Sequence, residues 1–195
     1  MVYKKQEVGE TVPESGYSVT YEQLNTLITF EKLWSSLTIW LLSYLISSVY
    51  DLANKEALVY QLFSIPTQFY NIFRVFYGPE IAQQFSNLLT HFLTSAINMI
   101  EALKTGEKEL ADSSTVEMFQ IADELARFLA PLNVYWEEEQ WKNLLNQFIS
   151  YFINEVVEMQ RGNYAEEISI FLRLDDVTDI IGGYMARGII ARQLR

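Results

Sequence analysis

The sequence contains no cysteine, and it has only one histidine, four prolines and eight glycines among its 195 residues. Without cysteine, the chain cannot form disulfides, thiolate metal sites or a cysteine nucleophile. Because zinc and di-iron centres need several converging ligands, a single histidine argues against them as well. We therefore expect no cofactor, no metal ligands and no catalytic residue set. The scarcity of proline and glycine favours long helices over a fold with many turns.

Basic residues are also scarce, with 14 Lys and Arg against 25 Asp and Glu, which gives a formal net charge of -11 at pH 7. No basic patch offsets this charge, so we expect no nucleic-acid partner, because phosphate backbones would repel the chain. Direct adsorption to anionic lipid is disfavoured for the same reason. The two lysines near the start are followed by no apolar run. We therefore expect no secretory signal and a cytoplasmic location.

Apolar residues are abundant, since 50% of the chain is hydrophobic and 14% is aromatic. This content is sufficient for a sizeable core, and the length is typical of one domain. Residues 1–20 are polar and lack periodicity, so they are predicted to form a poorly ordered arm. Residues 21–195 are predicted to form a single helical-bundle domain.

Hydrophobic residues recur with the spacing of one helix face in several segments. The clearest stripes are Phe85, Leu88, Leu89, Phe92, Ala96, Met99, Ile100 and Leu103, and Trp141, Leu144, Leu145, Phe148, Phe152, Val156 and Met159. Gly78-Pro79, Gly106 and Gly162 are typical of helix ends, and Pro66 and Pro131 indicate a kink or a boundary. The sequence predicts an all-α bundle of about six helices, at roughly 21–53, 55–76, 79–104, 108–130, 137–160 and 164–190.

An internal repeat is visible when the chain is shifted by 56 residues. The shift places Phe85 on Trp141 and Gly106 on Gly162, with matching Asn-Leu-Leu segments between them. Each copy has a shorter helix, a turn, a longer helix and a glycine stop. We interpret this pattern as a duplicated helix pair inside a closed bundle, because two copies are too few for a solenoid.

Residues 33–50 carry no charge over 18 positions, which touches the lower limit for a membrane span. The segment contains five Ser and one Thr, and it is not flanked by a basic cluster. A central helix that is buried on most sides is therefore the favoured interpretation, and membrane association is the less favoured alternative.

A series of packing and turn motifs runs through residues 30–190. They are Phe76-Tyr77-Gly78, Phe85 with Leu88-Leu89, Ala122-Asp123, Phe128-Leu129, Asn133 with Tyr135-Trp136, Trp141, and Gly162-Asn163-Tyr164. In these motifs the chain resembles an uncharacterised all-helical family, found mainly in Firmicutes, whose members often carry the automatic label acetylglutamate kinase. Such a kinase is an α/β protein with Gly-rich phosphate loops, and no segment of this chain has that pattern. The resemblance implies a helical fold. Its members' histidines fall on Leu37, Phe92 and Phe148, so any site built on them is expected to be apolar here.

Aromatic residues in the first half of the chain are candidates for lining a hydrophobic pocket, although core packing is the simpler interpretation. The single histidine lies beside an apolar stripe and is either a ligand or a solvent-facing side chain. The candidate ligand-binding residues are Trp34, Trp40, Tyr44, Phe73, Phe92 and His91.

The last helix carries two further features. Gly182, Gly183 and Gly188 predict a kink or a close helix contact, within the chain or between subunits. Its acidic residues are interpreted as a solvated face, because they do not have the spacing of a calcium-binding loop. These residues are Glu166, Glu167, Asp175, Asp176 and Asp179.

The leading functional hypothesis is a non-enzymatic binding protein or a self-associating interaction protein, with a homo-oligomer as one form. It rests on the large apolar content and the lack of a catalytic constellation. The alternatives are a carrier of a hydrophobic small molecule or lipid in a bundle cavity, a membrane-associated protein, and a metal-dependent bundle enzyme.

Overall fold

The computed structural model describes residues 19–193, and it confirms the predicted all-α bundle, with no strand in that range. The helices are α1 (Tyr21–Val49), α2 (Lys55–Leu62), α3 (Ser64–Tyr77), α4 (Pro79–Thr105), α5 (Lys108–Leu129), the short 3₁₀ turn η1 (Ala130–Leu132), α6 (Glu138–Arg161) and α7 (Tyr164–Gln193). The polar arm predicted for residues 1–20 lies almost wholly outside the described residues.

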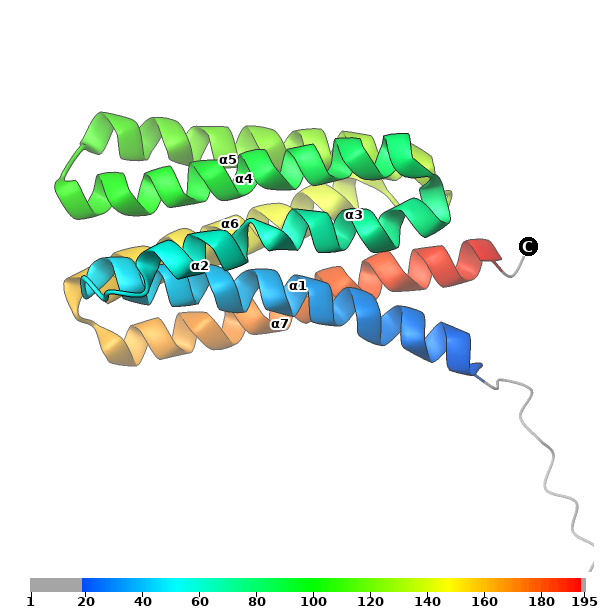
Figure 1. Ribbon diagram of the computed structural model, residues 1–195, viewed down its shortest axis with the longest axis horizontal. Coiled ribbons are helices and arrows are strands. Elements are labelled where there is room, and N and C mark those ends of the chain that lie inside the picture. The colour runs from blue at the N-terminus through cyan, green and yellow to red at the C-terminus, as the bar shows by residue number, and fades with distance from the viewer. Residues whose placement is uncertain (1–18, 194–195) are drawn as a thin grey trace, which may run out of the picture.

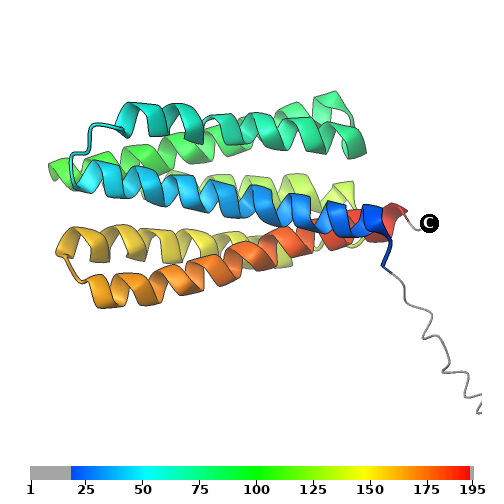
Figure 2. The ribbon, with the colours of Figure 1, turned by 60° about the horizontal axis from the view of Figure 1, so that its bottom comes forward.

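The long helices run roughly antiparallel along one axis (Figures 1 and 2). Helix α1 packs along α7, α4 packs between α3 and α5, and α6 joins α5 to α7. The short helices α2 and α3 follow one another and together span the length of one longer helix. The α1–α2, α4–α5 and α6–α7 connections therefore lie at one end of the bundle, on the left in Figure 1.

Local chemistry explains the helix boundaries. The hydroxyl of Thr20 accepts from the backbone N–H of Gln23, whose side chain accepts from the backbone N–H of Thr20, so the two form a capping box at the start of α1. Gly106 and Gly162 end α4 and α6 in the left-handed conformation, with φ of 79° and 71°. Both glycine stops were predicted.

The helix predicted over 55–76 is divided at Phe63 into α2 and α3. Pro66 lies in the first turn of α3. Backbone N–H groups in a first turn have no carbonyl partner within the helix, so proline loses no hydrogen bond there. In a continuous helix it would remove a backbone hydrogen bond and clash with the carbonyl of Leu62. The hydroxyl of Ser64 donates to the carbonyl of Gln61 at 2.6 Å and so supports the break.

The core is one continuous cluster rich in aromatic rings. Phe85 stacks on Phe73 at 4.7 Å between ring centroids and meets Phe69 edge-on at 5.5 Å. Trp141 meets Trp136 and Tyr184 edge-on at 5.6 and 4.9 Å. Such pairs add to the free energy gained by burying their apolar area. Phe85 and Trp141 are both fully buried, as the 56-residue repeat predicts, although duplication of the helix pair itself stays a prediction.

The glycines of α7 allow it to pack closely against α1 and against Trp136, which precedes α6. A Cβ built on Gly182 would lie 2.6 Å from the Cα of Glu31, and a Cβ on Gly188 would overlap the indole nitrogen of Trp136. The hydroxyls of Thr38 and Thr178 are 3.0 Å apart and buried between α1 and α7. The predicted close helix contact therefore occurs within the chain.

The uncharged stretch at residues 33–50 makes up the greater part of α1. Its Trp34, Leu37, Leu41 and Leu45 are core residues. Within residues 19–193, no helix combines the length and apolar character needed to cross a bilayer.

Candidate functional site

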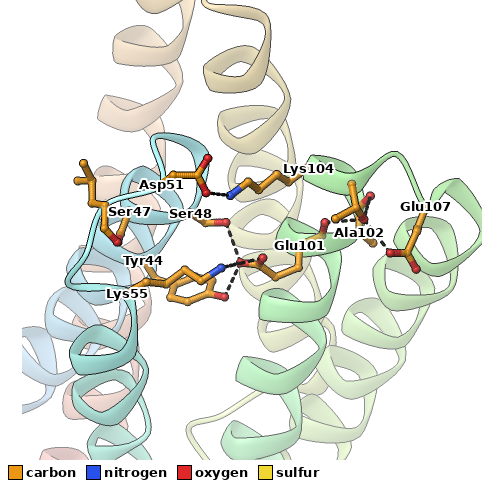
Figure 3. Close-up of polar contacts among 11 residues, drawn as sticks. Tyr44, Ser47, Ser48, Asp51, Lys55, Glu101, Ala102, Lys104 and Glu107 are labelled. Carbon is orange, nitrogen blue, oxygen red and sulfur yellow. Dashed lines mark hydrogen bonds and ion pairs between the residues drawn. The ribbon is translucent and has the colours of Figure 1, made fainter.

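A polar cluster joins α1, α2 and α4 at the end of the bundle that contains the α4–α5 connection (Figure 3). The carboxylate of Glu101 accepts from the Tyr44 hydroxyl at 2.6 Å, from the Ser48 hydroxyl at 2.7 Å and from the Lys55 ammonium at 2.9 Å. Lys104 forms an ion pair with Asp51 beside it. These contacts hold the α1–α2 turn against the end of α4.

The protonation states of this cluster are fixed by its own contacts. Burial opposes ionisation of Glu101, but the hydrogen bonds from Tyr44, Ser48 and Lys55 outweigh it and hold the carboxyl pKa below its usual value. Burial, with the adjacent Glu101 carboxylate, raises the pKa of Tyr44. A saturated carboxylate and a protonated phenol have no free group for chemistry, so we assign this cluster a structural role.

Replacing Glu101 by alanine is expected to lower the free energy of unfolding by about 2–3 kcal/mol, because it leaves two hydroxyls and one ammonium without their charged acceptor. Urea denaturation at neutral pH measures this loss. Glu124 is exposed on α5, and Glu124→Ala serves as the matched control with little expected change. Equal stability of the two variants would contradict the structural role.

A second feature at the same end is an apolar groove between α1, α6 and α7, open to water over about 280 Å³. Three helices contribute to its walls, α1 through its C-terminal half, α6 through its last turns and α7 through its first turns. The lining residues are Ile39, Leu42, Ser43, Ile46, Glu155, Met159, Glu167 and Phe171.

A buried carboxyl forms part of this groove. Glu155 is 1% exposed and occupies a core position on α6, next to Val156. Its Oε2 is buried and accepts no hydrogen bond from an N–H or O–H donor within residues 19–193. The carboxyl of Glu167, at the start of α7, faces it and shares a hydrogen bond with it.

Burial, together with the hydrogen bond to Glu167 and the negative charge of Glu167, raises the pKa of Glu155 to about 8. Among the ion pairs of residues 19–193, none involves Glu155 or Glu167. The pair therefore retains a proton at neutral pH, because no cation compensates a second negative charge. Two carboxyls sharing one proton are a familiar result of such crowding.

Two tyrosines stand near the pair. Tyr50, at the end of α1, shares a hydrogen bond with Tyr164, at the start of α7. This hydrogen bond, some burial and the nearby charge of Glu167 raise the pKa of Tyr50. Both side chains are about half exposed, so they place aromatic rings beside the acidic pair.

The candidate residues taken from the sequence do not meet in one ligand-sized cavity. Trp34 and Phe92 both line a void of about 10 Å³. There the ring of Phe92 packs on that of Phe148, with 6.0 Å between the ring centroids. Phe73 stacks in the aromatic core, and Tyr44 belongs to the Glu101 cluster. The two others lie apart from that void: Trp40 is half-buried against the core, and His91 is exposed on α4.

Sequence reasoning missed Glu155 and misassigned Glu167. The signal for Glu155 was present, because it falls on the apolar stripe of α6 between Phe152 and Met159. A carboxylate at a core position of an amphipathic helix is unusual and deserves a structural or functional reason. Glu167 was expected on a solvated acidic face, but it is half-buried beside Glu155.

Within the described part of the chain, no three histidine, aspartate or glutamate side chains converge on a position that could hold a metal ion. Comparisons of the chain with protein-family models, with curated proteins and with solved structures found no match.

Proposed function

We propose that this protein is a non-enzymatic binding protein that holds a small apolar molecule in the groove between α1, α6 and α7. The observation that carries the proposal is a groove lined mainly by aliphatic and aromatic side chains, with one buried polar group. Ligand sites commonly combine an apolar lining with a few polar groups that fix orientation.

Binding in the centre of the bundle is less well supported. The void beside Trp34 and Phe92 offers about 10 Å³, which is close to the space of one water molecule. Pockets for drug-sized ligands enclose roughly 300–1,000 Å³. A ligand at this position would have to displace closely packed rings, and such overpacking is unfavourable.

A wider depression of about 630 Å³ lies over α2 and α3. It runs beside side chains that face solvent, such as Tyr60, which is 83% exposed. Its lining contains no buried polar side chain to orient a ligand. The α1–α6–α7 groove is therefore the better candidate, since it combines enclosure by three helices with a polar anchor.

Self-association is a second candidate function, favoured by an apolar stripe on the outer face of α7. Tyr164, Ile168 and Leu172 follow one another at helical spacing, and each is more than half exposed. A second copy would bury this stripe, but the formal net charge of -11 opposes bringing two copies together. Light scattering coupled to size exclusion at low and high salt tests this alternative, with a dimer expected mainly at high salt.

The groove proposal predicts that the neutral hydrophobic dye Nile red binds and is displaced by a medium-length alkyl chain. Ile39 and Ile46 line the groove and are 54% and 41% exposed, so both accept polar replacements without loss of the core. The double variant Ile39→Gln, Ile46→Gln should weaken dye binding about fivefold to thirtyfold, because it removes apolar contact area. Fluorescence titration gives both affinities.

A matched control is Ile180→Gln on α7, since this isoleucine is 50% exposed and lies outside the groove lining. It should bind Nile red as the wild type does. The proposal fails if the wild type binds no dye, or if the control loses as much affinity as the double variant.

A further inference from the structure

The lining of the groove includes two acidic side chains that form no ion pair within residues 19–193. Glu155 is almost completely buried, its Oε2 accepts from no N–H or O–H donor among the described residues, and the carboxyl of Glu167 faces it. We propose that the ligand of this groove is an amphiphilic primary amine, whose ammonium group binds the carboxyls of Glu155 and Glu167 while its apolar chain lies along α1. This inference rests on the proposed function and adds the chemical class of the ligand.

Charge complementarity selects a cationic head group. The pair can accept several hydrogen bonds once it loses its proton, and a primary ammonium offers three N–H donors on a compact charge. Neither Glu155 nor Glu167 takes part in an ion pair within residues 19–193. An anionic head group should bind unfavourably, because it would add a further negative charge to a partly buried acidic site.

The remainder of the groove selects an apolar tail. Ile39, Leu42 and Ile46 follow one another along α1, and Phe171 of α7 and Met159 of α6 form the facing walls. These side chains offer no charged group to a polar tail. A linear alkyl chain can therefore lie along the row of α1 residues while its head group meets the carboxyl pair.

The size of the groove argues for a small molecule. Its volume of about 280 Å³ is near the lower limit of pockets that hold drug-sized ligands. The anchoring carboxyl of Glu155 is 1% exposed, so only a small head group can reach it. A flexible alkylamine can enter end-on, whereas a helix lying across the groove would keep its own charged groups at the rim.

Binding should release a proton, because an ammonium and a shared proton compensate the same charge. The raised pKa of Glu155 indicates that the pair holds this proton at neutral pH. The titratable groups that face the pair are Tyr50 at the end of α1 and Tyr164 at the start of α7, besides Glu155 and Glu167 themselves. The α1 residues in the lining do not titrate. Affinity for the amine should therefore increase from about pH 6 to about pH 8.

Isothermal titration calorimetry with three probes of the same chain length tests the head group. We expect n-octylammonium to bind, n-octanol to bind about tenfold to hundredfold more weakly, and octanoate to show no binding at neutral pH, because only the ammonium donates charged hydrogen bonds to the pair. Repeating the octylammonium titration in buffers of different ionisation enthalpy should reveal the release of about one proton per ligand.

Two conservative variants test the residues. Glu155→Gln and Glu167→Gln keep the size of each side chain, and each should reduce the preference for octylammonium over octanol to less than about threefold. Glu155→Gln should also abolish proton release, because Glu155 is the group with the raised pKa. Glu124→Gln, at an exposed position of α5, should leave both readouts unchanged. Circular dichroism confirms that the variants remain helical.

The outcomes separate this inference from the proposed function. Equal affinities for octylammonium and octanol, without proton release, would overturn the amine assignment while leaving an apolar groove that binds ligands. If neither probe nor Nile red binds the wild type, both proposals fail. If octylammonium binds tightly but Glu155→Gln and Glu167→Gln keep its advantage over octanol, the ammonium lies elsewhere and the inference is wrong.

Discussion

Replacing Gly182 by alanine is expected to destabilise the protein by about 2–4 kcal/mol, although alanine is the better helix former. A Cβ at this position would lie 2.6 Å from the Cα of Glu31, 3.0 Å from its nitrogen and 3.1 Å from the carbonyl oxygen of Phe30. All three atoms belong to the backbone of α1, so no rotation of a side chain can relieve the contact. Helices α1 and α7 would have to separate, and the buried Thr38–Thr178 hydrogen bond would lengthen with them.

The adjacent glycine provides a matched control. A Cβ on Gly183 would come within 2.7 Å only of the guanidinium of Arg187, which is the far end of a flexible, exposed side chain. Gly183→Ala should therefore be neutral, or should stabilise the protein by up to about 1 kcal/mol through helix propensity. Thermal and urea unfolding of both variants give the comparison. Equal effects of the two substitutions would show that α1 and α7 do not depend on the close approach at Gly182.

Most of the fold was predictable from local patterns in the sequence. The stripes on α4 and α6 each define one buried face, and the glycine stops at Gly106 and Gly162 mark where those helices end. These features are local, because a helix needs only its own spacing and caps to be recognised. The break at Phe63 was less clear, since hydrophobic residues continue on both sides and only Pro66 indicates it.

The candidate site was harder to predict because it depends on the meeting of three helices that are distant in the sequence. The α6–α7 hairpin places Glu155 and Glu167 together, but α1 supplies the wall that buries them. Nothing in the spacing of Ile39 and Ile46 distinguishes a groove from an ordinary exposed face. Conversely, the aromatic residues chosen from the sequence, such as Trp34 and Phe73, fill the core, where large rings gain most from burial.

The carboxyl pair should make the stability of the protein depend on pH in an unusual direction. The pKa of Glu155 is about 8 in the folded protein and near the ordinary value of 4.5 when the chain is unfolded. Between these pH values the folded state binds more protons than the unfolded state, so the free energy of unfolding falls as the pH rises. By about pH 9 the carboxyl is charged in both the folded and the unfolded state. The shift in its pKa then corresponds to a decrease in the free energy of unfolding on the order of 3–5 kcal/mol.

Urea unfolding between about pH 5 and pH 9 measures this decline in the wild type and in Glu155→Gln. The amide is neutral at every pH and donates to Glu167, so the variant should lose most of the decline and should exceed the wild type at about pH 9 by roughly 2–4 kcal/mol. Glu124→Gln, whose side chain is exposed on α5, should follow the wild-type curve. A buried carboxyl with no counter-ion destabilises the fold above neutral pH, and this is the property that a bound ammonium would remove. A wild-type curve parallel to that of Glu155→Gln would mean that the protein already stabilises the charged carboxylate of Glu155. A bound cation would then add no stability at this site.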